Sequence, residues 1–244
     1  MRGLSLNVYE GEWAFILGGN GAGKSTLLSL IAGLQKTCDG SISINGVNIK
    51  KYKNGSLYRG CLSMLPQEPK TLFVTDKVMS DMLHALSVVG ISGNEAEQKV
   101  NSIATELGIA HLLQKHPYDL SGGEVQKCAI ALILLKSPKI LLLDEPTKGL
   151  DAAAKHMLGD MLMSLKARGI TLVAVTHDLD FAAEYGDRCA LLFDGEITSN
   201  GEPHEFFARN AFYTTASSLI SREIADGAIT ASEVIDALNG RVAR

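Results

Sequence analysis

The sequence predicts an α/β fold with a parallel sheet, and three observations support this prediction. An apolar run at residues 13–17 leads through a glycine-rich turn into a helical pattern over residues 24–32. Four apolar residues at 140–143 have the composition of a buried parallel strand and end in two acidic residues. From Pro138 onward, strand and helix patterns alternate, as they do in sheets built from βαβ units.

The first glycine-rich turn matches the phosphate-binding pattern G-x-x-x-x-G-K-[ST] at every position and stands between a strand and a helix, as that pattern requires. Its backbone N–H groups and the helix N-terminus favour phosphate oxygens. Lys24 would reach the outer phosphates of a nucleotide and Ser25 a magnesium ion. An ordinary glycine-rich turn is the weaker interpretation because every position matches. The candidate nucleotide-binding residues are Gly18, Gly19, Asn20, Gly21, Ala22, Gly23, Lys24, Ser25 and Thr26.

Two carboxylates, Asp144 and Glu145, end the second apolar run. The carboxyl ends of parallel strands form the edge at which α/β folds bind ligands. Asp144 would organise Mg²⁺, and Glu145 would polarise an attacking water as general base. Acidic residues also end strands merely because they meet solvent. Here the letters PTKGLD follow at once over residues 146–151, and this wording is typical of one protein family.

A second glycine-rich turn, LSGGE at residues 120–124, opens a helical pattern over residues 123–136. Its place at a helix N-terminus makes it a second candidate anion site. One chain therefore holds two such sites.

Taken in order, these motifs resemble those of the ATP-binding cassette (ABC) ATPases, and the resemblance spans nearly the whole chain. Gln67 resembles the glutamine loop of that family, and His177, which follows an apolar strand, resembles its switch histidine. Neither residue would indicate chemistry alone. The resemblance implies that Gln67 senses magnesium and the lytic water, that His177 contacts the γ-phosphate, and that Asp151 lies in the loop that meets another subunit. Catalysis would then involve Glu145, His177 and Gln67, and the metal site Ser25, Gln67 and Asp144.

The resemblance also implies a fold, namely a RecA-like P-loop NTPase core with an antiparallel β subdomain and an inserted α-helical subdomain. We expect the ATPase domain over residues 1–204, its helical subdomain at about 68–136, and a helical C-terminal extension over 205–244. Local patterns predict hairpin turns at Asp39-Gly40 and Asn45-Gly46. Other predicted elements are strands at 4–8, 41–44, 172–175 and 189–193, and helices at 95–107, 152–168 and 231–238.

In the family, the nucleotide on the P-loop of one subunit is closed over by the LSGGE turn of another. Ser121, Gly122 and Gly123 would accordingly donate to the γ-phosphate across an interface. ATP would stabilise the closed dimer, and hydrolysis to ADP would release it. The resemblance therefore implies a dimer, either of this chain with itself or with a homologous ATPase.

Composition limits the alternatives. Of 244 residues, 46% are hydrophobic and 20% charged, which suffices for one or two domains. The net charge of −4 argues against a general nucleic-acid binder. The longest apolar run, at 128–135, is far below the roughly 20 residues of a membrane span, and no signal peptide is visible at the N-terminus. The four cysteines form no C-x-x-C pair, so no metal or redox motif is predicted.

Two stretches resemble the ATPases of energy-coupling factor importers, which take up vitamins and transition-metal ions in prokaryotes. One is the strand end at 143–151 with lysine at 148, and the other is residues 176–185. The tail that begins with Phe206-Phe207 and continues through residues 210–215 resembles the extension of the second ATPase half in fused members. Surface helices would account equally well for the tail's amphipathic pattern.

We therefore expect an ATP-binding and ATP-hydrolysing subunit of a membrane importer, with ATP and Mg²⁺ as cofactors. Its partners would be a second ABC ATPase subunit or a second copy, and an integral membrane subunit at the cytoplasmic face of the cell membrane, but no nucleic acid. Phe73 and Val74 would either border the groove for the membrane partner or pack in the core of the helical subdomain. A soluble ABC ATPase acting on ribosomes or DNA is the alternative, although no second cassette or coiled-coil insertion is present. A catalytically idle partner in an ATPase pair is a third interpretation, which the intact motifs oppose.

The chain departs from the family at its start. Members usually open with a strand and an aromatic loop that stacks on adenine, whereas only residues 4–8 and a turn at Glu10-Gly11 precede the P-loop here. Tyr9 and Trp13 are the nearby aromatics and are expected to pack in a strand-turn-strand. We expect either a piece of a longer polypeptide whose first half is another ATPase, which we favour, or unconventional adenine binding. Stacking of about 1–3 kcal/mol would be lost, so nucleotide affinity should be weak.

Overall fold

A computed structural model of the chain describes residues 3–53, 55–210, 213–221 and 227–242. Within these residues the central element is a six-stranded sheet with the order β4-β5-β6-β1-β7-β8. The first five strands are parallel, and β8 runs antiparallel to β7. The bounds are β1 Trp13–Leu17, β4 Leu62–Leu65, β5 Ile140–Asp144, β6 Thr171–Thr176, β7 Arg188–Phe193 and β8 Glu196–Gly201. The predicted α/β fold is confirmed.

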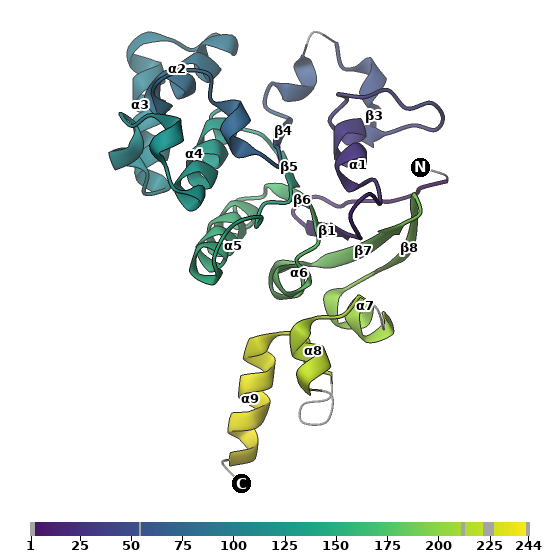
Figure 1. The fold of residues 1–244 in the computed structure, drawn as a ribbon. Helices are drawn as coiled ribbons and strands as arrows, with labels where there is room; N and C mark the ends of the chain where they lie inside the picture. Colours follow the sequence, from purple (N-terminus) through teal and green to yellow (C-terminus); the bar gives the residue numbers. More distant parts are fainter. Residues whose placement is uncertain (1–2, 54, 211–212, 222–226, 243–244) are drawn as a thin grey trace.

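Helices cover both faces of the sheet, which explains why every residue of β1 and β6 is buried. Alternate strand residues point to opposite faces. In β1, Phe15 enters a core shared with α5 (Ala152–Ala167) and α6 (Leu179–Tyr185), whereas Ile16 enters a second core shared with α1 (Lys24–Ile31). Figure 1 shows α1 on one side of the sheet and α5 and α6 on the other. The parallel strands therefore end at one shared edge between these layers.

Between β4 and β5 the chain forms a group of helices that lies beside the sheet (Figure 1). The amphipathic pattern predicted at 95–107 forms α3, which buries Ala96, Val100 and Ala104 on one face. The helix that follows the LSGGE turn is largely buried, as expected. The bounds are α2 Val78–Val88, α3 Gly93–Glu106 and α4 Gly122–Leu134, with 3-10 turns at Pro69–Leu72, Ala110–Leu112 and Pro117–Asp119. Two further 3-10 turns, Ile49–Lys51 and Ser56–Tyr58, precede β4.

The antiparallel part is smaller than predicted. Asn45 and Gly46 have φ angles of 51° and 74°, and they join β2 (Ser43–Ile44) to β3 (Val47–Asn48) as the predicted hairpin. The hairpin predicted at Asp39-Gly40 is wrong, because no strand lies between α1 and this bend among the described residues.

The strand predicted at residues 4–8 is also wrong. The segment forms no ladder with any described strand, although Leu4, Leu6 and Val8 pack against the α1 side of the core. Alternating apolar residues therefore anchor the segment, but a strand also needs a neighbouring backbone to pair with. Trp13 is fully buried, and the Arg188 guanidinium lies 4.7 Å from the ring centroid of the exposed Tyr9, so both aromatics pack as expected.

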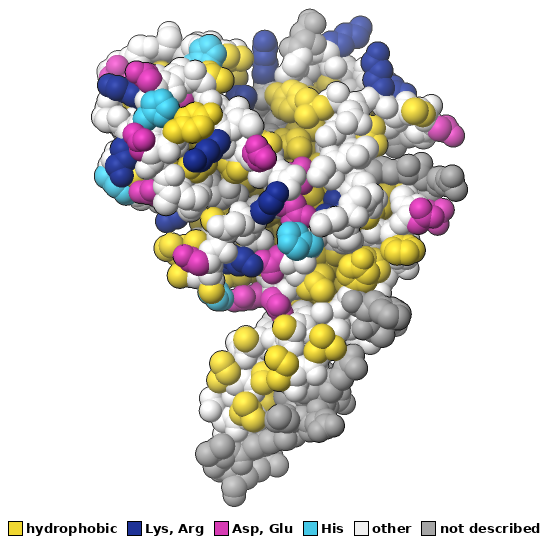
Figure 2. Space-filling model, viewed as in Figure 1, with side chains coloured by type: hydrophobic (Ala, Val, Ile, Leu, Met, Phe, Trp, Pro, Cys, Tyr) yellow, Lys and Arg dark blue, Asp and Glu magenta, His cyan; other side chains and the backbone are white. Residues whose placement is uncertain are grey.

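The C-terminal part begins with α7 (Pro203–Arg209), whose Phe206 and Phe207 are buried in the main core. The expected domain boundary at 204/205 thus falls inside a helix packed on β7 and β8. Beyond it, α8 (Ala216–Ser221) and α9 (Ala231–Val242) extend away from the sheet. Figure 2 shows hydrophobic side chains gathered on this part, where Leu219, Ile220, Ile235 and Leu238 are exposed. Of the tail residues, Ala211 and Phe212 lie outside the described residues.

None of the described helices is long and apolar enough to cross a membrane.

Candidate nucleotide site

The first glycine-rich turn joins β1 to α1 and depends on its glycines. Gly18, Gly21 and Gly23 have φ angles of 157°, 80° and 99°, which L side chains rarely adopt. A Cβ atom on Gly18 would lie only 2.4 Å from the carbonyl oxygen of Leu192. No side chain caps the start of α1, and its first turn holds no acidic residue. The helix N-terminus therefore leaves its N–H groups and partial positive charge to a ligand.

Lys24 is almost entirely buried over this turn, with 7% of its surface exposed. Its Nζ donates to the carbonyl oxygens of Gly18 at 2.8 Å and Gly19 at 3.2 Å. The same ammonium group lies 3.4 Å from Oε1 of Glu145. A buried cation is thus fixed between the turn and the acidic strand end.

Asp144 ends β5 next to the turn. The Ser25 hydroxyl donates to Asp144 Oδ1 at 3.0 Å. Burial raises the pKa of Asp144, and the nearby Glu145 adds to this, although the Ser25 hydrogen bond opposes it. Hydroxyl and carboxylate oxygens suit Mg²⁺, which keeps most of its waters and takes one or two protein ligands. Ser25 and Asp144 therefore fit such an ion, even though the described residues hold no cluster of three or more histidine, cysteine or acidic ligands.

Glu145 has a strained backbone and an almost completely enclosed side chain. Its φ angle is 48°, which is uncommon for a non-glycine residue, and its exposed fraction is 8%. Oε2 accepts hydrogen bonds from the Thr176 hydroxyl at 3.1 Å and from the His177 backbone N–H at 3.2 Å. His177 Nδ1 lies 2.8 Å from the same oxygen. The two carboxylate oxygens thus face different partners, Oε1 toward Lys24 and Oε2 toward the end of β6.

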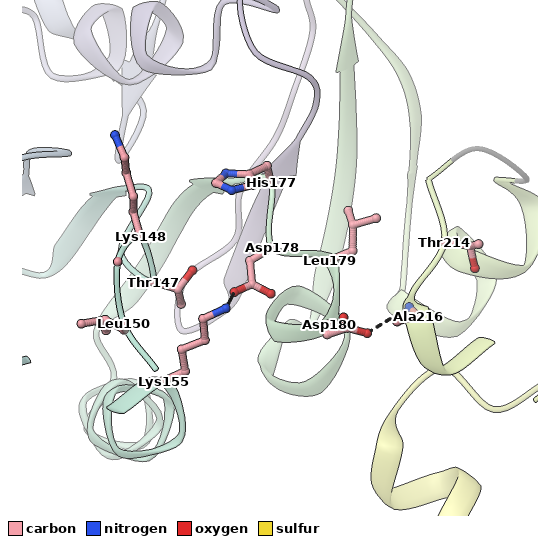
Figure 3. A pocket seen from close by; sticks show the side chains of 11 residues that line it. Thr147, Lys148, Leu150, Lys155, His177, Asp178, Leu179, Asp180, Thr214 and Ala216 are labelled. Atoms are coloured by element: carbon pink, nitrogen blue, oxygen red, sulfur yellow. Dashed lines mark hydrogen bonds and ion pairs between the residues drawn. The ribbon is translucent and has the colours of Figure 1, made fainter. Parts of the chain in front are cut away.

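His177 follows β6 and is itself 62% exposed. The next residue, Asp178, caps α6 by accepting from the Phe181 N–H, and it forms an ion pair of 2.5 Å with Lys155 of α5. Burial alone would raise the pKa of Asp178, but the hydrogen bonds from Lys155 and Phe181 outweigh it, and the pKa is lowered. In Figure 3 these side chains line a pocket of about 430 Å³ together with Lys148. Thr214 and Ala216 bring the C-terminal segment to the same pocket.

The LSGGE turn is built differently. The Ser121 N–H donates to Glu124 Oε2 at 2.8 Å, and the Glu124 N–H donates to Ser121 Oγ at 3.4 Å, which together form a capping box. The backbone hydrogen bond from Ser121 is the main cause of the lowered pKa of Glu124. A groove joins Ser121, Gly122 and Gly123 to the loop at residues 149–151 and to α5. Among the described contacts, no hydrogen bond or ion pair links this turn to residues 18–25.

The structure therefore brings together Lys24, Ser25, Asp144, Glu145 and His177, whereas Ser121, Gly122 and Gly123 line a separate groove. Gln67 is exposed beyond the end of β4, with no hydrogen-bond partner among the described contacts. Asn20 and Thr26 are exposed at the turn. Asp151 caps α5 by accepting from the Ala154 N–H at 2.8 Å and lies beside the LSGGE turn.

The sequence analysis did not predict three residues that hold the candidate site in place. Thr176 holds Glu145, Lys155 holds Asp178, and the buried Gln126 donates from α4 to the carbonyl oxygen of Pro146 at 2.8 Å. Thr176 directly precedes the predicted histidine, so a hydroxyl at that strand end was a usable signal. Lys155 and Gln126 lie 23 and 20 positions in the sequence from their partners, and no local pattern indicates either contact.

Comparisons relate the chain to known proteins. The model of the ABC transporter family matches residues 1–148. A putative ABC transporter ATP-binding protein of Bacillus thuringiensis is 39% identical over 239 residues, or 97% of this chain and 42% of that protein. The energy-coupling factor transporter ATP-binding protein EcfA2 of Ligilactobacillus salivarius is 36% identical over 85% of this chain and 74% of its own length. This chain thus spans 42% of the Bacillus relative and most of EcfA2.

A solved structure agrees with these relatives. The structure of cbiO1 from Clostridium perfringens, described as part of the ABC transporter complex cbiONQ, has a TM-score of 0.77 and 32% identity to this chain. The likeness covers 86% of this chain and 84% of that one.

Proposed function

The chain belongs to the ABC transporter family of ATPases, and from this premise we propose that it is the ATP-binding and ATP-hydrolysing part of an energy-coupling factor importer. The observation that carries the proposal is the meeting of Lys24, Ser25, Asp144, Glu145 and His177 at one edge of the sheet. The likeness to EcfA2 and cbiO1 supports the importer class.

The glycine turn would hold the phosphates of ATP through its N–H groups and the open start of α1. Ser25 and Asp144 would hold Mg²⁺, with Gln67 reaching it from the end of β4. Bound there, the ion would neutralise charge on the phosphate oxygens. Lys24 would exchange the carbonyl oxygens of Gly18 and Gly19 for the outer phosphates.

Glu145 would act as the general base on the attacking water. In the free site, Oε1 is occupied by Lys24 at 3.4 Å. When phosphate oxygens take over the ammonium group, Oε1 becomes free to accept a proton from water. His177 would turn its exposed ring from Glu145 to the γ-phosphate. The ion pair with Lys24 would therefore prevent Glu145 Oε1 from accepting a proton until a nucleotide has bound.

Dimer formation is part of the same proposal. The LSGGE turn has no described contact with residues 18–25 in its own chain, and its groove opens between α4 and α5. A second ABC ATPase subunit, or a second copy, would place this turn on the nucleotide. The dimer would sit at the cytoplasmic face of the membrane, bound to an integral membrane subunit near Val74, which is 77% exposed; its neighbour Phe73 is buried in the core.

Adenine would be held weakly. Trp13 is fully buried and is therefore not free to stack on a base, and the Arg188 guanidinium lies over the ring of the exposed Tyr9. We expect isothermal titration with MgATP to give a dissociation constant above the micromolar range for the chain alone. A sub-micromolar constant would contradict this expectation.

The proposed chemistry is tested by Glu145→Gln. We expect ATP hydrolysis to fall by about 10²–10⁴-fold, the usual contribution of a general base, while MgATP binding persists. Light scattering should then show a MgATP-dependent dimer, because the bound nucleotide is no longer consumed. The matched control is Glu95→Gln, an exposed glutamate on α3. If the Glu145→Gln variant hydrolysed ATP at the wild-type rate, Glu145 would not be the general base.

The importer class is tested by capturing the tagged protein from detergent-solubilised native membranes. Recovery of an integral membrane subunit is the expected result. Recovery of only ribosomal or DNA-associated proteins, with the tagged protein in the soluble fraction, would favour the soluble ABC ATPase.

A further inference from the structure

We propose that Thr176 is the positioning residue of Glu145. This inference deepens the proposed function and rests on it, because it concerns the same carboxylate. Thr176 is the last residue of β6, and none of its surface is exposed. Its hydroxyl donates to Glu145 Oε2 at 3.1 Å and accepts from the Asp178 N–H at 3.0 Å.

The hydrogen bond from the Asp178 N–H fixes the orientation of the Thr176 hydroxyl. A threonine hydroxyl has one proton to donate, and its lone pairs accept. Since the Asp178 N–H occupies a lone pair, the proton is left for the Glu145 carboxylate. Asp178 is itself fixed by Lys155 and by the Phe181 N–H. Threonine also suits the site because its branched Cβ restricts the χ1 rotamer.

Thr176 is needed because the other side chains that contact Glu145 are expected to move away from it when a nucleotide binds. In the proposed cycle, Lys24 moves from Oε1 to the phosphates, and the exposed His177 ring turns to the γ-phosphate. The contacts that stay are those of the buried strand end, namely the Thr176 hydroxyl and the His177 backbone N–H. Thr176 thereby becomes the one side chain among the described partners that holds Oε2 throughout turnover.

The test compares Thr176→Val, which removes the hydroxyl at nearly constant shape, with Thr176→Ser, which keeps it. Thr171→Val is the matched control. Thr171 begins the same strand, is 6% exposed, and its hydroxyl accepts from the Gly11 N–H at 3.0 Å, but it lies at the opposite end from the site. Both valine variants leave one backbone N–H without its acceptor, so a similar fall in Tm is expected for both.

We expect Thr176→Val to lower kcat by at least about tenfold, because a misplaced catalytic group is costly, with KM for MgATP changed by less than about twofold. Thr176→Ser should recover most of kcat, and Thr171→Val should keep it. A wild-type kcat in Thr176→Val would overturn the proposal. So would equal losses in the two valine variants, since these would indicate general destabilisation.

A crystal structure of Thr176→Val with a non-hydrolysable MgATP analogue gives a readout that does not depend on turnover, in the state in which Lys24 and the His177 ring are expected to have left Glu145. The Glu145 carboxylate is expected to leave its position 3.2 Å from the His177 backbone nitrogen in the valine variant and to keep it in the serine variant. An unmoved carboxylate in the valine variant would overturn the proposal. If the wild-type protein hydrolysed no ATP, the proposed function would fail, whereas these structures would still decide whether Thr176 holds Glu145.

Discussion

The two glycine-rich turns of this chain both open a helix, yet they are built in opposite ways. The turn at 18–25 uses glycines with positive φ, leaves the start of α1 uncapped and buries Lys24 over it. The turn at 120–124 has no glycine with positive φ, and Ser121 and Glu124 cap α4 themselves. An acidic first turn also opposes the positive end of the helix dipole that an anion needs.

This difference indicates which of the two turns could bind an anion by itself. The first turn supplies the open N–H groups, a buried cation and the neighbouring carboxylates of β5. The second turn supplies a capped helix end, and the first turn of α4 contains no cationic residue. On the proposed function, the second turn becomes useful only when another chain brings a nucleotide to it.

The largest effect should come from removing the cation. We expect Lys24→Ala to lower kcat for ATP hydrolysis by about 10²–10³-fold, which is the usual loss when one donor to developing charge is removed. Steady-state hydrolysis assays measure this, with Lys127→Ala, beside the second turn, as the control. A loss of the same size in the control would remove the distinction between the turns.

The next prediction asks whether the turns complete each other across two chains. Lys24→Ala and Ser121→Ala should each be inactive alone, whereas an equal mixture should regain about a quarter of wild-type activity. With random pairing, half of all dimers contain one copy of each variant, and one of the two sites in each of these dimers is intact. The measurement is ATP hydrolysis after mixing. Absence of any gain, when both variants are folded, would contradict self-pairing through these turns.

Alanine at the two sets of glycines should have different effects on stability. In Gly18→Ala the new Cβ would meet the Leu192 carbonyl oxygen at 2.4 Å, and φ is positive, so we expect a loss of about 2 kcal/mol or more. In Gly122→Ala the nearest atom is the Gly149 oxygen at 3.9 Å, so the free energy of unfolding should change by no more than about 1 kcal/mol. Urea denaturation followed by circular dichroism decides between them. Equal losses would show that the second turn is also conformationally constrained.

The smallest effect concerns pH. Because burial raises the pKa of Asp144, the native state keeps this proton at pH values where the unfolded chain has lost it. Stability from this group is present below the unfolded value of 3.8 and is lost as the pH rises through the raised pKa. Asp144→Asn removes the effect.

Without Mg²⁺ and nucleotide, the Asp144→Asn variant should therefore gain in unfolding free energy relative to wild type as the pH rises through this window. The difference should then become constant. Urea unfolding across a pH series measures it. A difference that shrinks with rising pH would mean that Asp144 is stabilised in its charged form.

Much of the fold and part of the site could be predicted from sequence because their causes are local. The backbone of residues 18–25 follows from glycines at required φ angles, and the hairpin at Asn45-Gly46 follows from its turn type. Buried strands such as β5 follow from runs of apolar residues. The segment at 4–8 shows the limit, since its alternation resembles a strand while no described strand pairs with it.

The sequence by itself determined the two turns, the acidic strand end and the order of the motifs, because each depends on residues close together in the chain. Only the tertiary structure decided that Thr176 holds Glu145 from 31 positions away and that Lys155 holds Asp178 from 23 positions away. It also decided that the LSGGE turn lies beside residues 149–151 rather than beside the P-loop. The physical reason is that parallel strands bring distant residues to one edge through backbone pairing, and pairing leaves no mark on the local pattern of residues.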